Sequence, residues 1–384
     1  MWQLLNREMN YAWGSPTSIP DFVGTQPTGE PVAELWMGAH PLAPSSIVDG
    51  DSTVLLPDLI ASDSERILGP DVLSWTSELP FLVKLLAAAT PLSLQVHPTA
   101  VQAEAGFAAE EKKGIGLTDP MRVFKDRNAK PEIMIALGPT RTLVGFRPVT
   151  DILVDLERIE GLWASKLRWA LTESLQPLHD GLSHITDRGV WEEHRNNVLP
   201  QVAALARSYG VFSLITELTD TFPTDPGVMA PLLMNCASYG HGSVLYTEPE
   251  TLHAHVNGFG VEVMATSDNV IRAGLTPKHL DREALLASLN GSSTEPHFIT
   301  STPEETTFVP PVNEFAVTIF EAGNECTRPG PRIALVIDGE AELVAGGTTL
   351  RLPRGHSAFI AHSDGPLTTR GKGTILLTYV PTRK

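Results

Sequence analysis

Two regions of short strand-like segments enclose one block of helical periodicity, and this order limits the possible folds more than any other feature of the sequence. In residues 1–148, Pro and Gly interrupt short apolar runs such as Phe81–Leu86 and Ile133–Leu137, which are typical of β-strands. The strand pattern resumes after Pro223, whereas residues 150–221 repeat their apolar side chains at helical spacing. The chain is therefore predicted to be mainly β with a helical insert.

The helical block contains two apolar series. The first begins beside Thr150 and Asp151, which are residues that favour a helix N-terminus. The second runs over Val202–Phe212 and contains Gly210, a weak point within the helical pattern. A separate helix is predicted over Val101–Lys113, as an excursion between two strands of the first β region.

A third unit is predicted at the C-terminal end of the chain. A polar segment from Asn290 to Glu305 resembles a linker, and several short strand patterns follow between Phe315 and Ala361. Asp338 and Gly339 are expected to form a tight hairpin turn among these strands. Together these features indicate a small sandwich or barrel.

The length of the chain also favours several domains. At 384 residues it exceeds the range of about 250–300 residues beyond which single cores rarely grow. We expect a β domain from residues 1–150 and 230–300, a helical domain from 151–229, and a C-terminal β domain from 301–384.

Composition excludes some classes of partner. The formal charge of −17 argues against nucleic-acid binding and against anionic membranes, although a few cations in a cleft can still bind a small phosphorylated substrate. Two cysteines form no disulfide framework, and the first residues lack the apolar core of a secretion signal. We expect a cytoplasmic protein, and the lack of a coiled-coil seam favours a monomer.

Two motifs in the first β region carry candidate metal ligands. Gln95 and His97 are two apart in a predicted strand, so both side chains would project from the same face. Glu132 lies at the start of an apolar strand, and its carboxylate is a suitable oxygen ligand for a metal ion. Taken alone, such motifs more often contain an ordinary hydrogen-bonded histidine or a solvated glutamate at a strand end than a metal ligand.

A third motif lies in the strand region after the helical block. His253 and His255 are again two residues apart, which suggests metal ligation. Farther along, Arg272 and Lys278 place two cations in a Gly- and Pro-containing segment, where they could bind a dianion such as a phosphate.

In this order, these motifs resemble the type I mannose-6-phosphate isomerases, also called phosphomannose isomerases. The similarity extends to Tyr11–Ser15, Ala33–Gly38, Pro41–Ser46 and Gly145–Pro148. The resemblance implies a cupin-type β-sandwich with an inserted α-helical domain and a second, C-terminal cupin-like β domain. It also implies a zinc-dependent enzyme that interconverts D-mannose 6-phosphate and D-fructose 6-phosphate through a cis-enediolate, as in GDP-mannose biosynthesis.

The resemblance also assigns roles to residues of this chain. It implies one zinc ion per chain, held by Gln95, His97, Glu132 and His253. Arg272 is the preferred residue for stabilising the enediolate and the phosphate of the phosphorylated hexose, with Lys278 as a second phosphate cation. Lys130 is a candidate catalytic acid or base.

Several alternatives stay open at this point. Asp268 and Glu262 are rival bases. The chain departs from many family members at Ala129, where they carry His, and at His255, where they carry an aromatic residue. The acidic segment Thr247–Glu250 replaces their small, Gly-containing turn and could alter the substrate preference.

Two other classes of function compete with the isomerase. A cupin oxygenase or epimerase is disfavoured because Gln95 occupies a position where a redox iron site normally has another His. A non-catalytic sugar-binding protein would have less reason to keep all of the presumed ligands. In the C-terminal unit, His356 and His362 could suggest a second metal, but a structural β domain is the simpler interpretation.

Overall fold

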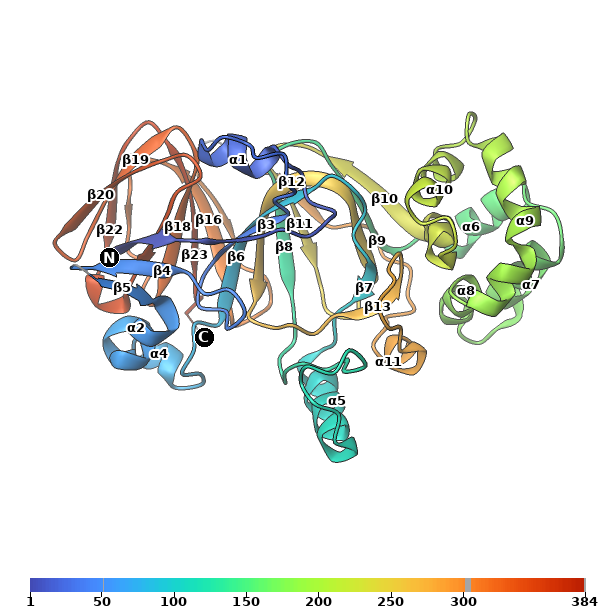
Figure 1. The fold of residues 1–384 in the computed structure, drawn as a ribbon, viewed down its shortest axis with the longest axis horizontal. Coiled ribbons are helices and arrows are strands. Elements are labelled where there is room, and N and C mark those ends of the chain that lie inside the picture. Colours follow the sequence, from blue (N-terminus) through green and yellow to red (C-terminus); the bar gives the residue numbers. More distant parts are fainter. Residues whose placement is uncertain (51, 301–304, 383–384) are drawn as a thin grey trace.

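The computed structural model describes residues 1–50, 52–300 and 305–382. Strands predominate, and five helices in a row separate two strand regions, so the predicted fold class is confirmed (Figure 1). The predicted linker, Asn290–Glu305, is only partly covered, because residues 301–304 lie outside the described residues. None of the described helices is both long and apolar enough to cross a membrane.

Among the described residues, the strands form three sheets. The eleven-stranded sheet contains β2 (Arg7–Met9), β3 (Glu34–Met37), β6 (Phe81–Ala88), β7 (Leu94–Val96), β8 (Glu132–Ala136), β9 (Thr140–Phe146), β10 (Met234–Tyr239), β11 (Ser243–Thr247), β12 (His253–Ala265), β13 (Ile271–Gly274) and β14 (Phe298–Thr300). The eight-stranded sheet contains β1 (Trp2–Leu5), β4 (Ser46–Asp49), β5 (Ser52–Leu55), β15 (Glu305–Phe308), β16 (Ala316–Glu321), β18 (Arg332–Asp338), β21 (Ser357–Ile360) and β23 (Thr374–Tyr379). The four-stranded sheet contains β17 (Glu325–Cys326), β19 (Glu340–Ala345), β20 (Thr348–Pro353) and β22 (Leu367–Gly371).

The eight-stranded sheet lies between the other two sheets, because alternate residues of its strands face opposite sides. On β18, Ile333 packs in one core with Phe81 of β6 and Val261 of β12. The next residue, Ala334, packs instead with Leu343 of β19. Strand β1 pairs with β21, so the start of the chain extends the C-terminal sheet.

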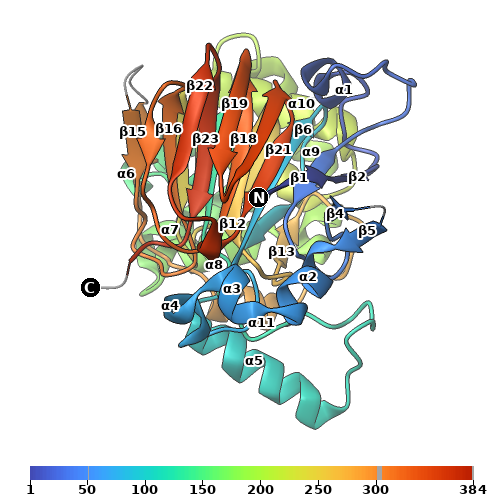
Figure 2. The same cartoon turned by 90° about the vertical axis from the view of Figure 1, so that its left-hand side faces the viewer.

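The helices surround these layers. Near one end of the molecule, α6 (Val149–Leu156), α7 (Leu162–Glu173), α8 (Pro177–Ile185), α9 (Arg188–Leu205) and α10 (Gly210–Thr221) form the helical block (Figure 1). The remaining helices are α1 (Ser18–Val23), α2 (Leu56–Ser62), α3 (Ser64–Leu68), α4 (Pro70–Leu73), α5 (Ala100–Lys113) and α11 (Arg282–Ala287), with 3₁₀ turns η1 (Pro226–Leu232) and η2 (His362–Asp364). The predicted helix over Val101–Lys113 is confirmed by α5, which projects below the sheets (Figure 2).

The local predictions for the helical block were confirmed in outline. Helix α6 begins at Val149, directly before Thr150, and Asp151 lies in its first turn, although neither residue caps the helix. The pattern over Val202–Phe212 is interrupted between α9 and α10, and Gly210, the predicted weak point, is the first residue of α10.

Asp338 and Gly339 do not form a hairpin. They connect β18 to β19, which belong to different sheets, and Gly339 has a positive φ of 65° that suits a glycine. The hairpin lies one strand later, at the Gly346-Gly347 turn between the paired strands β19 and β20. Both glycine positions look alike in the sequence, because only the pairing of distant strands separates a hairpin from a crossover.

Candidate active site

The eleven-stranded sheet presents a polar row on the face turned away from the C-terminal sheets. On β8, Ile133 and Ile135 enter the apolar core, so Glu132 projects to the opposite face. The same alternation places Lys84 of β6 and Glu262 of β12 on that face, and the strand register sets these two residues directly opposite each other.

Strand β12 connects this polar face to strands β7 and β9, which carry the other part of the site. Its last residues pair with β6 and β8, whereas its first residues pair with β7 and β9. The strand changes direction near Gly258, whose φ of 145° and close approach to Thr140 exclude a side chain. His253 thereby lies opposite Gln95, which in turn lies opposite Arg272 of β13.

The four predicted metal ligands converge. The Nε2 atom of His253 is 3.1 Å from Glu132 Oε1 and 3.3 Å from the side-chain nitrogen of Gln95. The Nε2 atom of His97 is 3.4 Å from Glu132 Oε2. His97, Glu132 and His253 are buried, and their ligand atoms all lie within 4.8 Å of one another. A half-turn of the Gln95 amide would present its oxygen to the same point.

Backbone carbonyl groups orient both histidines. The Nδ1 atom of His97 is 2.7 Å from the carbonyl oxygen of Asn269, and that of His253 is 2.9 Å from the carbonyl oxygen of Thr251. A carbonyl only accepts hydrogen bonds, so each Nδ1 carries the hydrogen and each Nε2 keeps its lone pair. Both lone pairs are therefore available to one metal ion, as a mixed nitrogen and oxygen site requires.

The side chain of Asn269 anchors this arrangement. Its oxygen accepts hydrogen bonds from the backbone nitrogens of Lys125 and Asp126 at 2.7 and 3.3 Å. Its nitrogen donates to the carbonyl oxygens of Asp126 and Asn128, both at 2.9 Å. The loop before Lys130 is thus fixed to the segment that precedes Arg272.

Lys130 dominates the electrostatics around the ligands. Its Nζ donates to Glu132 Oε2 at 2.5 Å and lies 3.2 Å from His97 Nε2. Burial, followed by the charge of Lys130, lowers the pKa of His97 to about 4. Burial raises the pKa of Glu132, but Lys130 and the two histidines outweigh burial and hold this pKa well below its usual range. Neutral imidazole and ionised carboxylate are the forms that bind a metal.

Lys84 is a buried site residue that the sequence interpretation missed. Its Nζ is 3.2 Å from Glu262 Oε2 and 3.5 Å from Glu34 Oε1, and it lies 4.8 Å from the centre of the Trp36 ring. Glu34 also accepts a 2.8 Å hydrogen bond from the indole nitrogen of Trp36. The available signal was a single lysine inside the apolar strand Phe81–Ala88, where a charge is rarely buried without partners.

The predicted phosphate cations belong to β13 and the segment after it, and β13 pairs with the strand that carries Gln95. Among the described residues, no carboxylate lies within ion-pair distance of Arg272 or Lys278. Arg272 is partly buried, which lowers the pKa of its guanidinium, and Lys278 is exposed. Burial and then the charge of Arg272 lower the pKa of Lys278, so the two cations share one electrostatic environment.

The other candidates have different surroundings. Asp268 forms a 3.4 Å ion pair with His40, and this contact outweighs burial and lowers the pKa of the aspartate. Glu250 accepts a 2.8 Å hydrogen bond from Gln102 of α5, so the acidic turn is tied to that helix. His356 and His362 belong to no potential metal cluster among the described residues.

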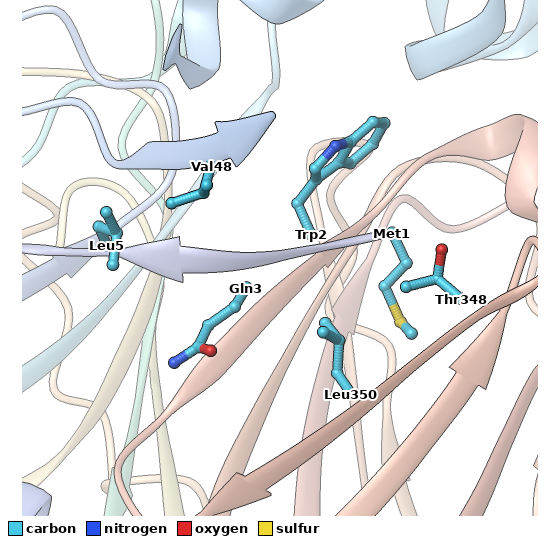
Figure 3. A pocket seen from close by; sticks show the side chains of 7 residues that line it. All are labelled: Met1, Trp2, Gln3, Leu5, Val48, Thr348 and Leu350. Atoms are coloured by element: carbon cyan, nitrogen blue, oxygen red, sulfur yellow. The ribbon is translucent and has the colours of Figure 1, made fainter. Parts of the chain in front are cut away.

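A hollow of about 460 Å³ lies elsewhere, beside the first strand (Figure 3). It is lined by Met1, Trp2, Gln3, Leu5, Val48, Thr348 and Leu350. Because none of these side chains is ionisable, we assign the chemistry to the polar cluster on the eleven-stranded sheet.

Comparison with known proteins identifies the family. Residues 1–149 match the model of the catalytic domain of type I phosphomannose isomerase, and residues 304–380 match that of the mannose-6-phosphate isomerase cupin domain. Mannose-6-phosphate isomerase from Escherichia coli (strain K12) is 34% identical over 99% of both chains. The chain belongs to the type I phosphomannose isomerase family. Its fold is accordingly the cupin-type β-sandwich with a helical insert and a C-terminal cupin-like domain.

Solved phosphomannose isomerase structures share the whole fold. The Salmonella typhimurium enzyme bound to its substrate fructose 6-phosphate and to zinc is 33% identical, with a TM-score of 0.92 over 99% of both chains. A zinc-bound mannose 6-phosphate isomerase gives the same identity, TM-score and coverage. More distantly, the human mannose-6-phosphate isomerase is 29% identical over 92% of each chain.

Proposed function

We propose that this phosphomannose isomerase is a zinc-dependent aldose–ketose isomerase that interconverts D-mannose 6-phosphate and D-fructose 6-phosphate. The observation that carries the proposal is the convergence of two histidine Nε2 lone pairs on the buried carboxylate Glu132. The similarity over the full length to a relative bound to fructose 6-phosphate and zinc supports the choice of substrate and metal.

We assign one zinc ion per chain to Gln95, His97, Glu132 and His253. The donor set of two imidazoles, one carboxylate and one amide suits zinc. When bound, zinc would supply Lewis acidity that favours negative charge on neighbouring substrate oxygens.

The charge of the cluster agrees with this assignment. Among the described residues, five buried side chains meet in ion pairs on the polar face: Glu34, Lys84, Lys130, Glu132 and Glu262. Three are negative and two are positive, so the face has one excess negative charge. A single divalent cation reverses the sign, and the resulting positive field favours an enediolate.

Phosphate binding and proton transfer are the two remaining tasks of the protein side chains. Isomerisation moves a proton between adjacent carbons, so one group must take the proton and return it. We propose that Arg272 and Lys278 bind the phosphate, because they are cations without carboxylate partners among the described residues. Lys130 is our candidate for proton transfer at the sugar, since its Nζ lies among the ligand atoms.

The remaining parts of the proposal follow from the sequence. We propose domains of residues 1–150 with 230–300, 151–229 and 301–384, and a cytoplasmic monomer without nucleic-acid or membrane partners. The net charge of −17 supports the exclusion of nucleic acid.

The test is isomerisation of mannose 6-phosphate by metal-stripped protein before and after zinc is restored. We expect activity to return with about one equivalent of zinc, and we expect no recovery in a Gln95→Ala/His97→Ala variant. An inactive zinc-loaded protein, with zinc binding confirmed, would refute the proposed function.

A further inference from the structure

His255 is a buried histidine that the proposed reaction does not yet use. It lies on β12, two residues after His253, and is 5% exposed. The strand register places it opposite Thr142 of β9, and Thr142 is itself buried. A buried polar side chain at this position requires hydrogen-bond partners.

The partners form a chain of contacts across three strands. The hydroxyl groups of Tyr239, on β10, and Thr142 are 2.9 Å apart. The Thr142 hydroxyl is 3.0 Å from Nδ1 of His255. On the opposite side of the ring, Nε2 of His255 lies 3.9 Å from Oε1 of Glu262. That separation exceeds a direct hydrogen bond, but the ring edge still faces the carboxylate inside the protein, where electrostatic contacts are weakly screened.

These contacts determine the position of the hydrogen on the ring. A ring hydrogen on Nε2 faces the negative charge of Glu262, so electrostatics favours this tautomer over the one with the hydrogen on Nδ1. In the neutral ring Nδ1 then accepts from Thr142, and the Thr142 oxygen accepts from Tyr239.

Glu262 is therefore contacted from both sides. Lys84 is 3.2 Å from its Oε2 atom, and His255 faces its Oε1 atom. Glu262, His255 and Glu132 bring their polar atoms within 4.8 Å of one another, so the Glu262 carboxylate lies beside the proposed metal ligand. The ammonium group of Lys84 already compensates Glu262, and this repels a second metal ion from the same atoms.

We propose that His255 is a positioning residue, which holds the Glu262 carboxylate toward the reacting sugar through the contacts that begin at Tyr239 and Thr142. This inference rests on the proposed isomerase function. Glu262 then lies in a fixed orientation between the Lys84 ammonium group and the His255 ring, and so becomes a preorganised group of the site.

Two substitutions at His255 separate its two contacts. An Asn side chain can keep the contact near Nδ1 with Thr142 but cannot reach Glu262. A Gln side chain can place an N–H near the position of Nε2 but lacks the geometry for Thr142. We expect His255→Asn to lower kcat for mannose 6-phosphate by about 10- to 100-fold with little change in KM. His255→Gln should keep kcat within about threefold of the unsubstituted protein.

Three controls complete the test. Thr142→Val keeps the volume and removes the hydroxyl, so it should lower kcat in the same direction as His255→Asn. In a Glu262→Gln background, His255→Asn should have little further effect on kcat. The zinc content of each variant shows whether the neighbouring ligand His253 is still in place.

Each outcome has a definite meaning. Equal kcat values for the Asn and Gln variants, or a loss that follows zinc content, would overturn the positioning role. An undiminished effect of His255→Asn in the Glu262→Gln background would also overturn it. If the unsubstituted, zinc-loaded protein failed to isomerise mannose 6-phosphate, the proposed function itself would fail.

Discussion

Replacing Lys84 by Met should destabilise the protein substantially, because this lysine neutralises two buried carboxylates. Lys84, Glu34 and Glu262 are each at most 7% exposed. Burial lowers the pKa of Lys84, but Glu34 and Glu262 outweigh burial and raise it above the ordinary value. Met keeps most of the volume and removes the charge, so the substitution tests electrostatics rather than packing.

The size of the loss in unfolding free energy follows from the contacts that Glu34 and Glu262 keep when Lys84 is replaced. Glu34 would keep its 2.8 Å hydrogen bond from Trp36. Glu262 would lose the 3.2 Å contact with Lys84 and keep only the 3.9 Å approach of His255. Breaking a buried ion pair in this way costs about 3–5 kcal/mol in the free energy of unfolding.

The assay is urea unfolding followed by tryptophan fluorescence, since Trp36 lies against the Lys84 ammonium group. The pKa of Lys84 is raised in the folded state, so its contribution is fully present below the unfolded pKa of about 10.4 and is lost only above the folded pKa. The difference between the two proteins should therefore persist from pH 7 to about pH 10.

A double variant provides the control. In Lys84→Met/Glu262→Gln a neutral amide replaces the carboxylate that loses its 3.2 Å contact with Lys84, and we expect at least about 1–2 kcal/mol of the loss to be recovered. A loss below about 1 kcal/mol for Lys84→Met, or no recovery in the double variant, would show that the buried charges are compensated in some other way.

Three further predictions concern the site and its frame. Gly258→Ala should lower the free energy of unfolding by about 2–4 kcal/mol in urea titrations, because its Cβ would lie 2.5 Å from Thr140 Oγ1 and its φ is 145°; an unchanged midpoint would contradict this. Asn269→Ala should weaken zinc binding by about 10- to 100-fold in a chelator competition, since the anchored loop holds the carbonyl partner of His97, and equal affinity would disprove that role. Arg272→Lys should raise KM for mannose 6-phosphate by about tenfold, because lysine cannot form the bidentate hydrogen bonds of a guanidinium with phosphate. An unchanged KM would show that Arg272 does not bind the phosphate.

Local chemistry made much of the fold predictable. The change between strand and helical spacing located the helical block, because side-chain periodicity depends only on neighbouring residues. The apolar run that follows Glu132 likewise suggested a carboxylate at the start of a buried strand. The turn at Asp338 and Gly339 was less predictable, because its role as a crossover between sheets depends on which strands pair.

The sequence by itself determined the residue types, their spacing on each strand and the resemblance to a family, and these were enough to name Gln95, His97, Glu132 and His253 as candidate ligands. Only the tertiary structure decided that Lys84 bridges Glu34 and Glu262, and that Asn269 orients His97. The physical reason is that hydrogen bonds and ion pairs act over about 3–4 Å, so their partners are set by strand register and packing between segments far apart in the chain.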